Sequence, residues 1–173
     1  LVTEIISTKR SAHHAFIAWL CRNTDKPIAF FNNVIPSAPP KLRELSFFNA
    51  TRNVADDARL RMLLDGDCNA LVNFEGKLPD SIERWNSGYF LPRLQGKLQR
   101  IVFLRDPINT LASLAKRSRP TRFRGRFNFF YQALGIEEML THLHDNPSRL
   151  CDRVVIFSHW RMSADYRARL ANE

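Results

Sequence analysis

Residues 2–22 read VTEIISTKRSAHHAFIAWLCR, and their hydrophobic pattern changes halfway along. Residues 2–7 have the pattern of a short buried strand. Beyond the turn, apolar residues recur at helical spacing, which predicts a helix over 12–22: Ala12, Phe16, Trp19 and Leu20. The turn between the two elements holds two cations, a serine and two histidines, and its role depends on the rest of the fold.

Further apolar runs alternate with helical patterns along the chain. We predict strands within 26–35 and over 70–75, 100–106 and 152–160, and helices over 54–64, from Pro107 onward, through 129–143 and over 164–171. Residues 36–41 and most of 76–99 read as loop. Strands that are apolar on both faces and separated by helices indicate a parallel sheet covered on both sides. The predicted fold is α/β, a three-layer sandwich with a central parallel sheet.

Two helices have predicted inward faces. Asp106 is expected to be an N-cap, with Pro107 at the first helical position. The buried face of that helix is expected to hold Ile108, Leu111, Ala112 and Ala115. In the long helix that follows, the expected buried face holds Phe129, Ala133, Ile136, Leu140 and Leu143.

Composition limits the class of protein. A chain of 173 residues suits a single domain, 1–173, and because it opens on Leu1 we expect residues to be missing at one or both ends. The 26 basic and 17 acidic side chains give a net charge of +9, which favours an anionic ligand. The three cysteines show no CxxC spacing, so neither a disulfide framework nor a zinc site is indicated, and a reducing, cytoplasmic location is predicted. No apolar run reaches the ~20 residues of a membrane span.

Ligands of parallel sheets bind beyond the carboxyl ends of the strands. The opening turn and the turn at Arg105 therefore share one edge. A helix N-terminus there, with Lys9 or Arg10 adding a full charge and Ser11 a hydroxyl, suits an anion. Ala12 would allow close approach of a ligand, provided its φ is not positive. The alternative is a plain basic turn capped by serine. The motif GxxxxGK[ST] is absent, which disfavours an ordinary ATP or GTP hydrolase.

Three segments together resemble the sulfotransferase family. STKRSAHHAFIAWL (7–20) resembles its 5′-phosphosulfate loop, although Ala12 replaces the usual glycine and two histidines replace the commoner threonines. RIVFLRDPINTLASL (100–114) resembles the 3′-phosphate motif: an apolar strand, an arginine, a turn with proline and a serine eight residues after the arginine. VVIFSHWRMSADYRARLANE (154–173) resembles the late strand, tryptophan and Tyr-Arg helix of bacterial-type members.

The resemblance implies a P-loop NTPase-like fold and an enzyme that moves a sulfuryl group from 3′-phosphoadenosine 5′-phosphosulfate (PAPS) to a hydroxyl or amine. The product nucleotide is 3′-phosphoadenosine 5′-phosphate (PAP). The resemblance implies that Arg10 is the catalytic cation, that Arg105 and Ser113 hold the 3′-phosphate, and that no metal is required. The 5′-phosphosulfate would be held by Lys9, Arg10, Ser11, Ala12, His13 and His14.

The acceptor hydroxyl needs a general base. Glu75 is expected at the end of its strand, at the ligand edge, and His14 is the competing base; a structural alternative pairs Glu75 with Lys77. The acceptor is expected to be a small molecule or a glycan, since Trp85, Tyr89 and Phe90 could stack on sugar rings.

Residues 116–126, KRSRPTRFRGR, hold six cations and no acid, and read as a loop. They could attract PAPS or an anionic acceptor. They also support an alternative function, a non-catalytic nucleotide- or polyanion-binding domain. Nucleic acid is the less favoured partner, because the neighbouring aromatic residues lead into an amphipathic helix and not into a strand platform.

Overall fold

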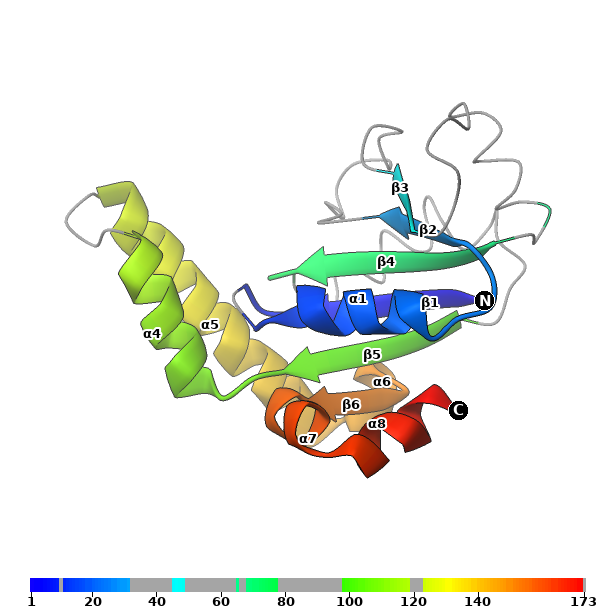
Figure 1. The fold of residues 1–173 in the computed structure, drawn as a ribbon. Coiled ribbons are helices and arrows are strands. Elements are labelled where there is room, and N and C mark those ends of the chain that lie inside the picture. The colour runs from blue at the N-terminus through cyan, green and yellow to red at the C-terminus, as the bar shows by residue number, and fades with distance from the viewer. Residues whose placement is uncertain are drawn as a thin grey trace.

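The computed structural model describes residues 1–9, 11–31, 45–48, 65, 68–77, 98–118 and 123–172. Its centre is a six-stranded sheet with the order β3-β2-β4-β1-β5-β6 (Figure 1). The strands are β1 (Val2–Ser7), β2 (Ile28–Phe31), β3 (Leu45–Phe48), β4 (Asn69–Glu75), β5 (Leu98–Leu104) and β6 (Arg153–Ile156).

Five of these strands are parallel, and the edge strand β3 pairs antiparallel with β2. The first strand of the chain, β1, lies between β4 and β5, so that Ser7 is in register with both Glu75 and Phe103. The carboxyl ends of β1, β4 and β5 therefore meet at one edge, and the turn that follows β1 emerges there. The strand, turn and helix come in the order of a P-loop fold.

Helices cover both faces of the sheet. They are α1 (His13–Arg22), α4 (Pro107–Ser118), α5 (Phe123–Asp145), α6 (Pro147–Leu150), α7 (Phe157–Met162) and α8 (Ala164–Ala171). On one face Phe16 and Ile17 of α1 pack on Ile5, with side chains of α7 and α8 beside them. On the other face Met139 of α5 and Leu150 of α6 pack on the opposite side of β1. The predicted three-layer α/β class is confirmed (Figure 1).

Aromatic rings fill the layer between the sheet and α1. Phe16 stacks on Phe103 of β5 with ring centroids 4.9 Å apart, and Trp160 of α7 meets the edge of Phe16 at 5.8 Å. Phe157 and Trp160 lie three residues apart on α7, so both rings reach Phe103. The strand predicted over 152–160 is therefore corrected: it ends at Ile156. The next residues begin a helix, because that spacing packs both half-buried rings against Phe103 of the sheet.

Most other predicted elements are confirmed with small shifts in their ends. The strands within 26–35 and over 2–7, 70–75 and 100–106 form, and the last helix spans Ala164–Ala171 as predicted. The strand β3 was not predicted. The helix over 54–64 and the loop over 36–41 lie outside the described residues.

The inward faces of α4 and α5 differ from the predicted ones. Ile108 is 77% exposed, whereas Thr110 and Leu114 are buried, so α4 is turned by about one residue from the predicted face. In the part of α5 whose side chains are described, from Phe129 onward, the buried positions are Gln132, Ile136 and Met139, and Leu140 is 38% exposed. Both helices bury a polar side chain, which a pattern of apolar residues does not detect.

Residues 116–118 and 123–126 belong to α4 and α5, so most of the predicted basic loop is helical.

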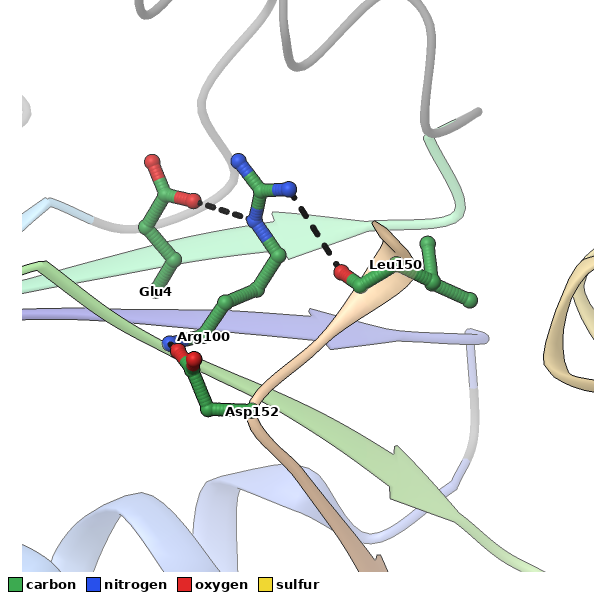
Figure 2. Close-up of polar contacts among 4 residues, drawn as sticks. All are labelled: Glu4, Arg100, Leu150 and Asp152. Carbon is green, nitrogen blue, oxygen red and sulfur yellow. Dashed lines mark hydrogen bonds and ion pairs between the residues drawn. The ribbon is translucent and has the colours of Figure 1, made fainter. Parts of the chain in front are cut away.

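One ion pair is buried within the sheet. Glu4 of β1 is in register with Arg100 of β5, and Arg100 Nε donates to Glu4 Oε2 at 2.8 Å (Figure 2). The same guanidinium reaches the carbonyl of Leu150, while the backbone N–H of Arg100 donates to Asp152 Oδ2 at 2.7 Å. The Glu4 side chain is fully buried and that of Arg100 is 13% exposed. This pair joins the two central strands to the segment that precedes β6.

Candidate anion site at the carboxyl edge of the sheet

The turn from β1 to α1 is built on a left-handed residue. Ser11 N–H donates to the carbonyl of Thr8 at 3.3 Å, and Ala12 then takes φ 67° and ψ 19° before α1 begins at His13. The requirement that Ala12 avoid a positive φ is therefore not met. A left-handed alanine costs about 1 kcal/mol, because its Cβ crowds the following carbonyl. This torsion is the one that the glycine of the family motif would adopt without strain.

Ser11 and His13 face each other across this turn. Ser11 Oγ lies 3.0 Å from His13 Nδ1, and both side chains are buried. The His13 ring contacts that of His14, with centroids 4.1 Å apart, while His14 itself is exposed. Burial, together with the charge of the neighbouring His14, lowers the pKa of His13 from 6.5 to about 4. His13 is therefore neutral at pH 7.

Several buried polar atoms at this edge have no hydrogen-bond partner among the described residues. They are Ser7 Oγ at the end of β1, His13 Nε2 at the start of α1 and Thr110 Oγ1 in α4. Buried polar atoms in native proteins are nearly always paired, so a group of exceptions calls for an explanation. The N-terminus of α1, with its unpaired backbone N–H groups, points into the same turn. The hydroxyls of Ser7 and Thr110 and the N–H groups at the start of α1 can donate hydrogen bonds to an anion.

The second motif begins where β5 ends. Asp106 caps α4 as predicted: its Oδ1 accepts from the backbone N–H of Asn109 at 2.7 Å. Arg105 precedes the cap and is half-buried, with its guanidinium carbon 5.5 Å from the centre of the Phe157 ring. This cation–π contact holds the guanidinium group against the Phe157 ring. Ser113 lies two turns into α4 and is also half-buried.

A pocket of about 180 Å³ joins the two motifs. Thr8 of the opening turn and Arg105 of the second motif line it together, with Pro107 and Thr110 of α4 beside them. A second pocket, lined by Ser7, Thr8 and residues of α5, adjoins the first at Thr8 and Met139. Each is smaller than the ~300–1,000 Å³ that holds a drug-sized ligand, so a nucleotide would need both or would extend beyond them.

The end of β4 adds a residue that the sequence did not identify as part of the site. Glu75 is at the ligand edge as predicted, beside Ser7, and is half-buried. Gly76 follows with φ 65°, and its N–H donates to the carbonyl of Ser7 at 2.6 Å. Lys77 then lines the second pocket. Burial lowers the pKa of Lys77, the charge of Lys9 lowers it further and that of Glu75 raises it. The pairing of β1 with β4 places this segment at the site, because the two strands end side by side at Ser7 and Glu75.

The remaining predicted site residues are placed as follows. Lys9 is half-buried in the opening turn, and His14 lies in the first turn of α1. Arg10 lies outside the described residues, as do residues 119–122 of the basic segment. Among the parts of the chain that the structure describes, no group of three His, Cys, Asp or Glu side chains could hold a metal ion, and no helix is long and apolar enough to cross a membrane. Cys21, Cys68 and Cys151 are buried and none of the three forms a disulfide.

Comparison with known proteins gives a likeness in fold. No family model matches this chain, and no curated protein matches its sequence. Among solved structures, the chain is similar to retinol dehydratase in a complex with retinol and PAP, with a TM-score of 0.45 and 12% sequence identity. The similarity covers 99% of this chain and 59% of retinol dehydratase, so this chain spans about three fifths of the length of that protein.

Proposed function

We propose that this chain binds PAPS at the carboxyl edge of its sheet and transfers the sulfuryl group to a hydroxyl or amine acceptor. The observation that carries the proposal is the pocket that Thr8 and Arg105 line together. These residues come from two of the three segments that carry the sulfotransferase resemblance, 7–20 and 100–114, which are far apart in the sequence. The pairing of β1 with β5 brings the segments side by side, as one nucleotide with phosphates at both ends would require.

The residues at this edge fit such a ligand. The N-terminus of α1, the Ser7 and Ser11 hydroxyls and the half-buried Lys9 suit a phosphosulfate, because each supplies a hydrogen-bond donor or a positive charge. When bound, PAPS supplies the sulfuryl group and a phosphate on which negative charge builds as transfer proceeds. We assign Arg105 and Ser113 to the 3′-phosphate.

The chemistry is assigned to residues of the same edge. Arg10 neutralises the charge that develops on the departing phosphate, with Lys9 as the second cation. Glu75 or His14 accepts the proton of the acceptor hydroxyl. The acceptor is a small molecule or a glycan. We further propose a cytoplasmic location from the cysteine usage, and the bacterial-type branch from residues 154–173.

Nucleotide affinities test the cofactor assignment. PAP should bind more tightly than AMP or ADP in calorimetry, because only PAP carries a 3′-phosphate. Replacing Arg105 with alanine should remove that preference, weakening PAP by roughly 10- to 100-fold, the usual size of a hydrogen bond to a charged group. Arg22→Ala is the matched control, since Arg22 is exposed at the far end of α1. Equal affinities of the wild-type protein for PAP and AMP would overturn the proposal.

Steady-state kinetics test the catalytic cation. Arg10→Ala should lower kcat and kcat/KM together, by roughly 100- to 1,000-fold, because the contact is made in the transition state. Lys9→Ala should lower them less. The readout is PAP formed from PAPS in the presence of a panel of sugars, alcohols and amines. An Arg10→Ala protein with unchanged kcat would mean that the turn only caps α1. Binding of PAP without turnover on any acceptor would instead favour the non-catalytic nucleotide-binding domain.

A further inference from the structure

His13 and Ser11 form a closed pair at the start of α1. The Nδ1 to Oγ distance is 3.0 Å, His13 is 1% exposed and Ser11 is fully buried. His13 Nε2 has no partner among the residues that the structure describes. Within the described part of the chain, the imidazole therefore hydrogen-bonds to Ser11 alone, and the left-handed Ala12 lies between the two residues.

The hydrogen in this bond can belong to either side. A neutral imidazole carries one N–H and one bare nitrogen, whereas a serine hydroxyl has a single hydrogen to donate. If Ser11 donates to Nδ1, its hydrogen is used and the hydroxyl cannot donate to a ligand. If Nδ1–H donates to Ser11 Oγ, the hydroxyl hydrogen remains available. In both arrangements Nε2 has no hydrogen-bond partner among the described residues. The contacts of the imidazole in the absence of a ligand therefore do not select one tautomer.

An anion in the turn decides between them. The oxygens of a phosphate ester or sulfate dianion accept hydrogen bonds and have none to donate, so Ser11 can contact such an oxygen only as a donor. The bound state therefore requires the hydrogen of the Ser11–His13 bond to sit on Nδ1.

We propose that His13 is a positioning residue for Ser11: its Nδ1–H donates to Ser11 Oγ and directs the serine hydrogen to a bound phosphate oxygen. The inference rests on the proposed function, because PAP or PAPS supplies that oxygen. His13 does not itself touch the ligand in this arrangement. It fills the position where the family motif commonly has threonine, and supplies through its ring a donor to the preceding serine. Burial keeps the ring neutral near pH 7, as the one-hydrogen arrangement requires.

Nitrogen NMR of the wild-type protein tests the tautomer directly. Nitrogen-15 shifts distinguish a protonated from a bare imidazole nitrogen, and the His13 signals are identified by their loss in His13→Asn. Saturation with PAP at pH 7 should give a single Nδ1–H tautomer for His13. A bare Nδ1 in the PAP complex would overturn the inference without any variant having to fold.

A double-mutant cycle tests whether His13 acts through Ser11. Ser11→Ala and His13→Leu should each weaken PAP by roughly 10-fold or more, the scale of one hydrogen bond to a charged group. In the Ser11→Ala background, His13→Leu should have almost no further effect on PAP affinity. His13→Asn should recover most of the affinity, because its side-chain amide can donate from nearly the same place as Nδ1. His144→Asn is the matched control, at the exposed end of α5.

The outcomes separate the two proposals. Wild-type protein that binds PAP no better than AMP would overturn the proposed function and this inference with it. Wild-type protein that prefers PAP, combined with additive effects of Ser11→Ala and His13→Leu, would overturn the inference alone. Each variant is checked by thermal unfolding, so that loss of affinity is counted only for folded protein.

Discussion

The sheet holds two sets of buried polar side chains, and they differ in how they are satisfied. Glu4 and Arg100 bind each other at 2.8 Å, and the Arg100 N–H also donates to Asp152. At the carboxyl edge, Ser7 Oγ and His13 Nε2 have no partner within the described part of the chain. Both sets are buried by the same sheet, so burial alone does not separate them. The charges of the first set are paired with each other inside the protein, whereas the second set has hydrogen-bonding capacity to spare.

This difference predicts two kinds of response to mutation. A buried pair whose charges offset each other contributes to one folded arrangement, and removing one partner leaves a charge without compensation. Polar atoms left without partners reduce stability in the absence of ligand and are available when one binds. Mutations in the first set should therefore change stability and leave nucleotide affinity alone. Mutations at the carboxyl edge should weaken nucleotide affinity and should have a smaller effect on the free energy of unfolding.

Breaking the ion pair should have the largest effect on stability. Arg100→Leu should lower the free energy of unfolding by about 3–5 kcal/mol, because the Glu4 carboxylate then stays buried without its partner. The measurement is urea unfolding followed by circular dichroism. PAP affinity of the folded fraction should stay the same.

The double variant Glu4→Leu/Arg100→Leu sharpens this test. It removes both charges and should recover most of the loss, since apolar replacements of a buried pair are often neutral. If Arg100→Leu were as stable as the double variant, an unpaired Glu4 carboxylate would not be the cause of the lost stability.

Acid should weaken the fold through His13. Its pKa is about 4 in the folded protein and about 6.5 in an unfolded chain, so the unfolded state takes up a proton first. The stability that neutral His13 provides is complete above about pH 6.5 and is lost progressively as the pH falls to about 4. The loss amounts to about 3 kcal/mol at most. Unfolding free energies at several pH values measure it, and His13→Asn, which cannot titrate there, should show a shallower fall. The same slope in both proteins would contradict the assignment to His13.

Relief of backbone strain should give the smallest effect. Ala12→Gly should raise the free energy of unfolding by about 1 kcal/mol, because glycine adopts φ 67° without the clash of a Cβ. Ala12→Val should lower it and should also weaken PAP binding, since a β-branched side chain crowds the turn. Thermal unfolding of the three proteins provides the comparison. A less stable Ala12→Gly protein would show that the gain in the turn is smaller than the cost of a more flexible unfolded chain.

The architecture was predictable because strands that are apolar on both faces have few alternatives to a parallel sheet. That architecture also predicted where the opening turn and Arg105 would meet, since carboxyl ends of parallel strands share an edge. The helix at Phe157 was not predicted, because a short apolar run fits a strand or a helix equally well. Only the three-residue spacing of Phe157 and Trp160 favoured the helix.

The finer features of the site depend on contacts between distant segments. Glu4 reads as an interruption of an apolar run, and nothing near it in the sequence indicates that Arg100 will pair with it. The torsion of Ala12 is set by the meeting of β1 and α1, whereas sequence preference disfavours a left-handed alanine. Lys77 lies at the site because β4 ends beside β1, where the opening turn begins. Each of these features depends on how two strands align, which a local pattern does not specify.

The Glu4–Arg100 pair also has a consequence for errors in folding. If β5 joined β1 one residue out of place, Arg100 would turn to the opposite side of the sheet, and Glu4 would be left buried among apolar side chains. The same slip would move Arg105 about 3.3 Å along the strand, away from its place beside Thr8. A misaligned chain would thus lose the ion pair and the ligand pocket in one step. The Glu4–Arg100 pair thus disfavours the register slip that would displace Arg105, although Arg100 lies near the other end of β5.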